Sequence, residues 1–136
     1  MDIGAELGGP TLLPAPSLGK EARMTTEVPM TPAVYQILLS LADGDRHGYG
    51  IMQEVEERTD GEMRLGPGTL YRSIKRLRKA RLIEGLEASE LIGEDADRRR
   101  FYRITASGRK MLEDEARRLA RLVAQAETKR VIDATL

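Results

Sequence analysis

The sequence predicts a mainly α-helical fold with one small β-hairpin and a long last helix. Apolar residues recur at helical spacing in three short segments between residues 31 and 81. Two short segments of strand-like composition follow, and helical spacing returns after Thr105. Residues 1–28 lack such periodicity, which is typical of a flexible arm or of an over-long gene start. We therefore expect three parts: a flexible N-terminal tail (1–28), one domain (29–105) and a C-terminal helix (106–136).

The first two helices begin at recognisable residues. Thr31 is a favourable N-cap because its hydroxyl accepts an unpaired helix N–H, and Pro32 at the first helical position loses no hydrogen bond. Asp43-Gly44-Asp45 should end this helix, and a second helix should run from about Tyr49 to Thr59. The side chains expected to face inward are Val34, Ile37, Leu38, Leu41, Ile51, Met52 and Val55. Those expected to face outward on the second helix are Glu54, Glu56 and Glu57.

The third helical segment is locally cationic, although the whole chain is neutral. Residues 64–81 contain seven Lys or Arg and no Asp or Glu, whereas the chain carries 22 residues of each sign. Leu70, Ile74 and Leu77 fall on one helical face. The basic residues that point the other way are Arg72, Lys75, Arg76 and Lys79. A short helix that is anchored on one face and cationic on the other fits the major groove of DNA.

An ordinary amphipathic helix with a solvated charged face is the alternative for this segment. Such a face usually mixes signs and gains Glu–Lys pairs four residues apart, and this one has none. Adjacent like charges repel each other unless a polyanion neutralises them, which favours nucleic-acid binding. Gly66-Pro67-Gly68 is typical of a tight turn before the helix, with Thr69 as its candidate N-cap. Three short helices with Gly-containing turns give the order of a helix-turn-helix domain.

A β-hairpin is predicted directly after the third helix. Its first strand should run from Ile83 to Ile92, its polar turn over 93–97 and its second strand from Arg98 to Ile104. A hairpin in this position is the wing of a winged helix-turn-helix domain. Phe101 and Ile104 are expected to face the core of the domain.

Arginines gather in the second strand of the hairpin. Arg98, Arg100 and Arg103 are expected near the tip and on the outer face, where they can lie along the phosphate backbone or the minor groove. Arg98-Arg99-Arg100 alone would indicate only a soluble turn. Its position beside the cationic helix favours a DNA contact.

A last helix of up to about 28 residues, roughly 40 Å long at ~1.5 Å per residue, should follow the capping residues Thr105-Ala106-Ser107. Its apolar positions are spaced 4, 3, 4, 3, as in a short coiled-coil seam: Leu112, Ala116, Leu119, Val123 and Ala126. A small winged domain cannot cover this whole stripe, so we expect a second copy of the chain to cover it in a C2 homodimer. A helix that folds back on its own domain is the alternative.

Four segments together carry a resemblance to a known family. They are Met30-Thr31-Pro32 through Leu38-Leu39, His47-Gly48-Tyr49-Gly50-Ile51, Gly66-Pro67-Gly68-Thr69-Leu70-Tyr71 with Lys75-Arg76-Leu77, and Arg99-Arg100-Phe101-Tyr102-Arg103-Ile104-Thr105 with Gly108. In this order and spacing, over about residues 30–126, they resemble the PadR family of bacterial winged-helix transcriptional regulators, in its shorter branch with a single C-terminal helix. The resemblance implies a homodimer that binds double-stranded operator DNA. It also implies repression of its own promoter or that of a neighbouring transporter or detoxification gene, with release by a small-molecule effector.

The resemblance also implies which residues face DNA. The matching positions are Tyr49, Thr69, Tyr71, Arg72, Lys75 and Arg76 in the helices, and Arg98, Arg99 and Arg100 in the wing. Tyr71 fits equally well as an aromatic at the edge of the core. The family's wing more often has the sequence Gly-Arg-Pro-Arg-Lys, whereas here Asp97 precedes three arginines without a proline.

Composition excludes several other classes of protein. The absence of cysteine rules out disulfides, thiolate catalysis and zinc–thiolate sites. His47 is the only histidine, and a metal site needs several converging ligands, so His47 is interpreted as a turn residue and no metal or cofactor is expected. The sequence has no pattern typical of an acid–base pair, an activated nucleophile or a phosphate loop, so we do not expect an enzyme.

No run of about 18 apolar residues and no signal-peptide core is visible, which predicts a soluble cytoplasmic protein without membrane contact. The leading hypothesis is a sequence-specific, ligand-responsive transcriptional repressor. The alternative is a winged-helix module whose basic helix contacts an acidic protein partner without DNA specificity.

Overall fold

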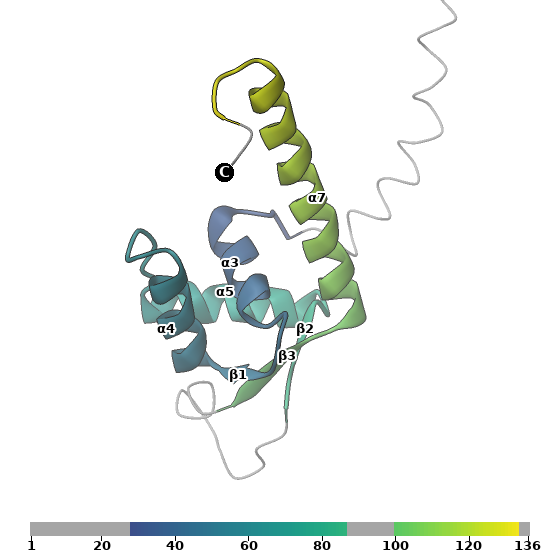
Figure 1. Ribbon diagram of the computed structural model, residues 1–136. Coiled ribbons are helices and arrows are strands. Elements are labelled where there is room, and N and C mark those ends of the chain that lie inside the picture. Colours follow the sequence, from purple (N-terminus) through teal and green to yellow (C-terminus); the bar gives the residue numbers. More distant parts are fainter. Residues whose placement is uncertain (1–27, 87–99, 134–136) are drawn as a thin grey trace, which may run out of the picture.

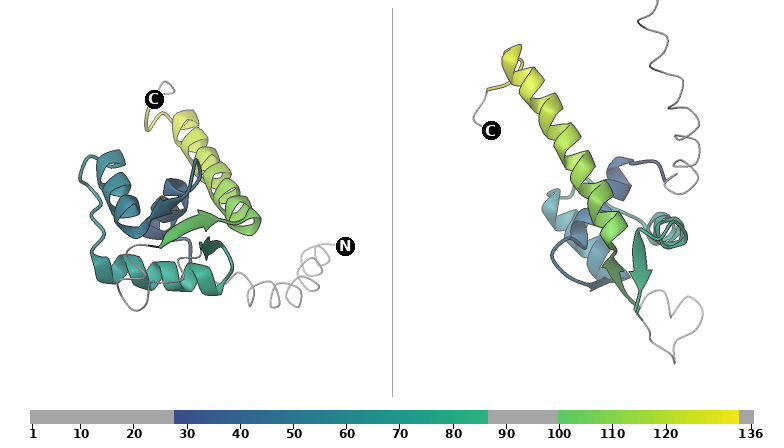
Figure 2. Two further views of the ribbon diagram at one scale, coloured as in Figure 1. Left: turned by 90° about the horizontal axis from the view of Figure 1, so that it is seen from below. Right: turned by 90° about the vertical axis from the view of Figure 1, so that its right-hand side faces the viewer.

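The computed structural model describes residues 28–86 and 100–133, and Figure 1 shows their arrangement. The helices and strands in these residues are α3 (Pro32–Ser40), β1 (Arg46–His47), α4 (Gly48–Arg58), α5 (Pro67–Lys79), β2 (Ile83–Gly85), β3 (Phe101–Ile104) and α7 (Ala106–Thr128). The helices α3, α4 and α5 form one body with the small sheet, and α7 rises from this body (Figures 1 and 2). The predicted mainly α-helical fold with a small β element is thereby confirmed.

The starts of α3 and α4 follow from their capping residues. The Val34 N–H donates to Thr31 Oγ1 at 3.1 Å, and Pro32 occupies the first turn of α3, as predicted. At the start of α4 the Gly50 N–H donates to His47 Nδ1 at 2.9 Å. His47 is therefore a helix cap rather than a turn residue. The sequence did not indicate this role because Ser, Thr, Asp and Asn are the usual caps.

The start of α5 differs from the prediction. Gly66 is the N-cap, and Pro67 and Gly68 belong to the first turn of the helix rather than to a tight turn before it. Thr69 consequently lies inside the helix and does not cap it. Proline suits the first helical position because its φ is fixed near helical values and its missing N–H would have no partner there.

Three helices end with residues in the left-handed region. Arg81 has a φ of 63° after α5, Asp60 has 52° after α4, and Arg130 has 65° after α7. The Val131 N–H then donates to the Ala126 carbonyl at 2.9 Å, which closes the last turn of α7. This closure explains why α7 has 23 residues and ends at Thr128 rather than continuing toward the C-terminus.

The sheet has three antiparallel strands in the order β1-β3-β2. Ile83 pairs with Ile104 across β2 and β3, and Arg46 pairs with Tyr102 across β1 and β3. The predicted hairpin strands are present but shorter than expected: β2 ends at Gly85 and β3 begins at Phe101. The predicted polar turn lies outside the described residues. Strand β1 was not predicted, because two residues are too short for a periodic pattern.

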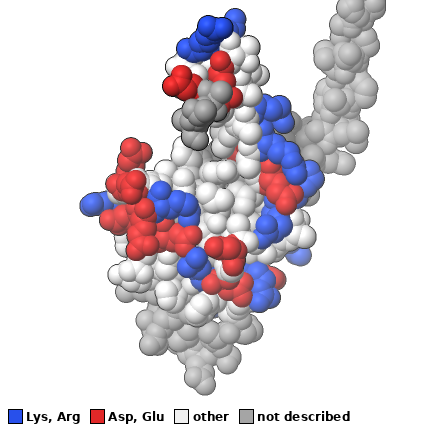
Figure 3. Space-filling model, in the orientation of Figure 1, with Lys and Arg blue, Asp and Glu red and all other residues white. Residues whose placement is uncertain are grey.

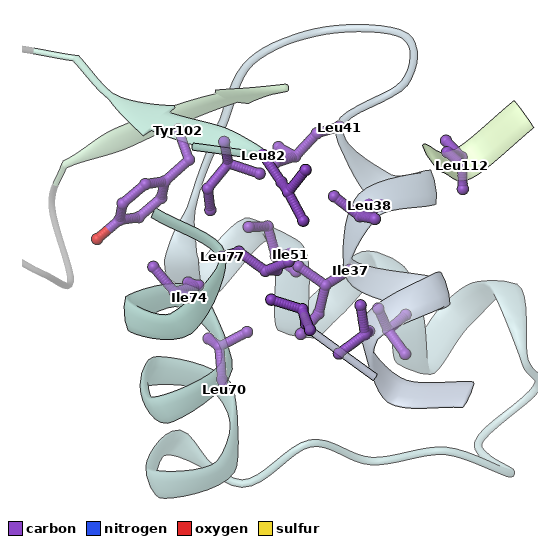
Figure 4. Packing of buried hydrophobic residues seen from close by; sticks show 14 residues of the cluster. Ile37, Leu38, Leu41, Ile51, Leu70, Ile74, Leu77, Leu82, Tyr102 and Leu112 are labelled. Carbon is purple, nitrogen blue, oxygen red and sulfur yellow. The ribbon is translucent and has the colours of Figure 1, made fainter. Parts of the chain in front are cut away.

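The core lies between the three short helices and the sheet (Figure 4). Its most buried side chains include Ile37, Leu38, Ile51, Val55, Leu70, Ile74, Leu77, Leu82 and Tyr102. Every apolar position predicted for α3 and α5 is buried, whereas Met52 is half-buried. Phe101 does not face the core as predicted: it is 46% exposed, and its neighbour Tyr102 is fully buried. Ile104 is half-buried against the core.

The base of α7 is held against the end of α5 and strand β2. The Thr105 hydroxyl donates to the Arg81 carbonyl at 2.8 Å and accepts the Gly108 N–H at 3.0 Å. Gly108 is buried, and a Cβ there would overlap the Leu82 carbonyl oxygen. Val28, which the sequence analysis placed in the tail, packs in the core at 8% exposure, so the folded region includes this residue.

Candidate nucleic-acid interface

Helix α5 presents the cationic face that its sequence predicts. Leu70, Ile74 and Leu77 anchor the helix in the core. The exposed residues of the other face are Thr69, Arg72, Lys75, Arg76 and Lys79. Within the described residues, no Asp or Glu makes an ion pair with any of these cations, and Arg72 Nη2 makes only a long contact of 3.4 Å with Thr69 Oγ1. The positive charge of this face is therefore not neutralised by the described part of the chain.

Acidic residues gather elsewhere on the molecule. Figure 3 shows the face on which α3, α4 and α7 lie, and Asp and Glu side chains cluster there over α4. Because a polyanion approaches a cationic face and avoids an acidic one, this separation of charge in a neutral chain favours an approach to α5.

Tyr49 lies at the exposed start of α4. Its side chain is 56% exposed, so it is available for contact with a partner. His47 stacks at a tilt on Phe101, with 5.3 Å between the ring centroids, so two aromatic rings pack together where β1 pairs with β3 just before α4. The cap hydrogen bond to Gly50 fixes His47 Nδ1 as the acceptor, so the ring cannot turn freely.

Tyr71 is a packing residue between α5 and α4. It is half-buried against the core, and a Cβ at Gly48 would overlap its hydroxyl. The two interpretations of Tyr71 were equally open from the sequence. Its contact with Gly48 favours a role in setting the relative position of the two helices of the helix-turn-helix.

A polar network that the sequence analysis did not predict joins α3, β1 and α4. Glu54 was expected to face outward, but it pairs with Arg46 at 2.5 Å and with Arg58 at 2.6 Å. Arg58 also donates to Gln36 Oε1 and to the Ser40 hydroxyl, and Arg46 Nε donates to the Ser40 carbonyl. The spacing of Glu54 and Arg58, four residues apart on one helix, was the signal that could have indicated it.

The arginines of the wing divide into separate roles. Arg98 and Arg99 lie outside the described residues. Arg100 is half-buried at the base of the wing. Arg103 is not available on an outer DNA-facing surface as predicted, because Nη2 donates to Asp45 Oδ2 at 2.9 Å and Nε to Asp45 Oδ1 at 3.2 Å. This hydrogen bonding, together with the charge of Asp45, raises the pKa of Arg103 above its ordinary value.

The predicted seam residues of α7 have different environments. Leu112 is 5% exposed and belongs to the core of its own domain, so its assignment to a seam between two chains needs correction. Farther along, α7 projects beyond the domain (Figure 2). There Val123 is 40% exposed, Ala116 is exposed, and Leu119 and Ala126 are half-buried. Leu122, which was not predicted, is 45% exposed and adds to the apolar surface.

The described residues contain neither a membrane-spanning helix nor a cluster of metal ligands. Between 28 and 86 and between 100 and 133, no helix has the length and apolar character needed to cross a membrane. In the same ranges, no three His, Cys, Asp or Glu side chains converge as a metal site would require.

Residues 37–114 match the sequence model of the transcriptional regulator PadR-like family. The chain belongs to this family. A 37.1 kDa protein in transposon TN4556 of Streptomyces fradiae is 41% identical over 86 residues, which are 63% of this chain and 22% of that protein. A transcriptional regulator of Mycobacterium tuberculosis is 36% identical over 89 residues, which are 65% of this chain and 77% of that regulator. The chain thus spans about a fifth of the transposon protein and most of the mycobacterial regulator.

Solved structures share the fold of this PadR-like chain. A transcriptional regulator from Clostridium thermocellum superposes with a TM-score of 0.57 at 27% identity, over 82% of this chain and 99% of that one. Bacillus subtilis PadR, solved in complex with operator DNA, superposes with a TM-score of 0.54 at 24% identity, over 65% of this chain and 48% of that one. The winged helix-turn-helix architecture is confirmed by these likenesses. The family consists of transcriptional regulators rather than enzymes, which confirms the prediction of a non-enzymatic protein.

Proposed function

We propose that this PadR-like regulator is a homodimeric, sequence-specific DNA-binding repressor. The observation that carries the proposal is the exposed cationic face of α5, whose lysines and arginines have no carboxylate partner among the described residues. Bacillus subtilis PadR, which shares this fold, was solved with operator DNA. By that analogy α5 lies in the major groove of the operator.

The side chains divide by the part of DNA that they reach. Arg76 and Arg72 point outward from α5 and contact base edges, because an arginine can donate two hydrogen bonds to one guanine. Thr69, Lys75 and Tyr49 flank them and bind the sugar-phosphate backbone. The wing arginines Arg98, Arg99 and Arg100 neutralise phosphates beside the groove, whereas Tyr71 supports α5 from behind.

The projecting half of α7 supports a dimer. The apolar residues Leu119, Leu122, Val123 and Ala126 recur at i, i+3, i+4 and i+7, which makes one continuous stripe. Two copies of α7 that pack through this stripe bury side chains that one chain leaves exposed. A twofold dimer then reads an inverted repeat whose half-sites are about one helical turn, ~10 bp, apart.

Regulation by a small molecule completes the proposal. The repressor acts in the cytoplasm on its own promoter or on that of a neighbouring transporter or detoxification gene, and an effector releases it. The chain has no tryptophan and one phenylalanine, so an effector pocket between the long helices and the first helices of the dimer is mainly aliphatic.

Selection of bound duplexes from a random DNA pool tests the proposal. We expect enrichment of an inverted repeat, and an affinity for it that falls as a power of the salt concentration because bound phosphates release counterions. Absence of enrichment would overturn sequence-specific binding. Weak DNA binding without any preference, together with salt-sensitive binding to an acidic polypeptide, would instead support the protein-contact module.

A further inference from the structure

A hollow of about 450 Å³ lies along one flank of α5. The described residues that line it are Tyr71, Ile74, Lys75, Arg78 and Lys79. Ile74 is 2% exposed and gives the hollow an apolar floor, while three cations surround it. Lys75 was predicted as a DNA contact but Arg78 was not, because a pattern of outward-facing residues does not show what lies beside the flank of a helix.

Arg78 is held in this hollow by strand β3. Its guanidinium carbon lies 5.9 Å from the ring centroid of Tyr102, and that tyrosine is fully buried. In Figure 4 the ring of Tyr102 lies beside Ile74 of α5. A cation near the face or edge of a buried ring loses conformational freedom before any ligand arrives, which lowers the entropic cost of binding.

Gly85 of β2 leaves the space into which Arg78 extends. A Cβ at Gly85 would lie 3.2 Å from Arg78 Cζ and 3.2 Å from Nη2, and it would also overlap the side chain of Arg100. The backbone of Gly85 is not in the left-handed region, so its conformation does not require glycine. The missing side chain therefore matters for the approach of two arginines, one from α5 and one from the wing.

Arg78 and Arg76 point to opposite sides of α5. Residues two positions apart on a helix differ by about 160° around its axis, since ~3.6 residues complete one turn. Arg72 lies between them on the exposed face, about 120° from Arg78, so a helix that directs Arg72 at base edges directs Arg78 at the wall of the groove, where the sugar-phosphate backbone runs. The planar guanidinium can donate two parallel hydrogen bonds to one phosphate, which suits this position.

We propose that the hollow formed by Lys75, Arg78 and Lys79 binds backbone phosphates of the operator, with Arg78 as a pre-oriented phosphate anchor. This inference rests on the proposed DNA-binding function and adds a backbone contact between α5 and the wing. Its partner is the phosphodiester backbone of duplex DNA. The same chemistry would also hold a free phosphate anion, so the experiment separates the two.

Arg78→Met tests the anchor because methionine keeps an apolar stem over Tyr102 and loses the charge. Each lost phosphate contact lowers the slope of log affinity against log salt by about 0.9, so a dimer loses about 1.8. If the two proteins bind equally at ~1 M salt, this difference in slope makes Arg78→Met bind up to about 60-fold more weakly than the wild type at ~0.1 M salt. The loss should be equal on the selected operator and on random duplex DNA. Arg78→Lys should restore most of the slope, since it restores a cation.

Two further variants keep the test sharp. Gly85→Ala removes no charge but displaces the side chains of Arg100 and Arg78, and it should lower affinity in the same sequence-independent way. Arg121→Gln is the matched control, because it removes one exposed charge from α7, far from the hollow, and should leave the slope unchanged. Thermal unfolding of each variant shows whether the fold is kept.

The outcomes separate this inference from the proposed function. If the wild-type protein binds no DNA, the proposed function itself fails. If the wild type binds DNA and Arg78→Met keeps its affinity and salt slope, only the phosphate anchor is refuted. If the wild type but not Arg78→Met binds inorganic pyrophosphate, while both bind DNA with the same affinity and salt slope, the hollow is a small-anion site, and the backbone assignment is wrong.

Discussion

Gly48→Ala should disturb the contact that sets α4 against α5. Gly48 is the buried first residue of α4, and its φ lies outside the left-handed region, so alanine meets no backbone penalty. The added Cβ would overlap the Tyr71 hydroxyl and lie 2.8 Å from Cε1 and 2.9 Å from Cζ of the same ring. Overpacking of this kind costs about 1 to 3 kcal/mol. The higher helix propensity of alanine offsets at most about 1 kcal/mol of this cost.

The Tyr71→Leu background isolates the cause. Leucine lacks the ring atoms and the hydroxyl that the new methyl group would meet. Gly48→Ala should therefore be neutral or slightly stabilising in this background. The coupling free energy between the two substitutions should be about 1 to 2 kcal/mol, within the usual range for residues in contact. Urea unfolding followed by circular dichroism, at one fixed protein concentration because dimerisation adds to stability, measures all four proteins of the cycle.

The functional readout of the same cycle is operator affinity. Gly48→Ala should weaken binding beyond its effect on folding, since a displaced Tyr71 shifts α5 relative to α4, and Tyr71→Leu should reverse part of that extra loss. Equal destabilisation by Gly48→Ala in both backgrounds would refute the reasoning, because the cost would then not arise at Tyr71.

Three further predictions concern the end of α5, the seam on α7 and the N-terminal tail. Arg81 has a φ of 63°, so Arg81→Gly should raise the free energy of unfolding by roughly 1 kcal/mol, whereas Lys75→Gly in the interior of α5 should lower it by about 1 kcal/mol; equal effects in urea unfolding would contradict this. Leu119→Asp should give monomers in light scattering while Arg117→Asp, off the stripe, stays dimeric; a dimeric Leu119→Asp would disprove the α7 seam. Removal of residues 1–27, with Val28 kept, should change operator affinity less than tenfold, about 1.4 kcal/mol, and a larger loss would reveal a DNA-contacting arm.

Periodicity predicted the helices and their buried faces well. Leu70, Ile74 and Leu77 are buried because a helix that must pack at all turns its apolar stripe inward. The same reasoning failed in β3, where a four-residue strand gives too little alternation to decide which face is inside, and Tyr102 rather than Phe101 fills the core.

Contacts between distant residues could not be read from local patterns. Arg103 pairs with Asp45 although 58 positions separate them, and this pairing removes Arg103 from the predicted DNA-facing surface. The hollow beside Arg78 likewise depends on how β2 and β3 lie against α5. Leu112 has the spacing of a seam residue, but the way α7 leans on α3 and β3 places it in the core.

The division of labour between α5 and the wing tests the central claim most directly. Arg76→Ala and the triple variant that replaces Arg98, Arg99 and Arg100 by alanine should be compared on the selected operator and on random duplex DNA across a salt series. Arg76→Ala should weaken the operator more than random DNA, by about 1 to 3 kcal/mol for each lost bidentate contact. The triple variant should weaken both alike and flatten the salt slope by up to about 5 per dimer. Loss of sequence preference in the wing variant, with only general weakening in Arg76→Ala, would exchange the two roles. Unchanged DNA binding in both variants would contradict the account of α5 and the wing as the DNA-binding surface.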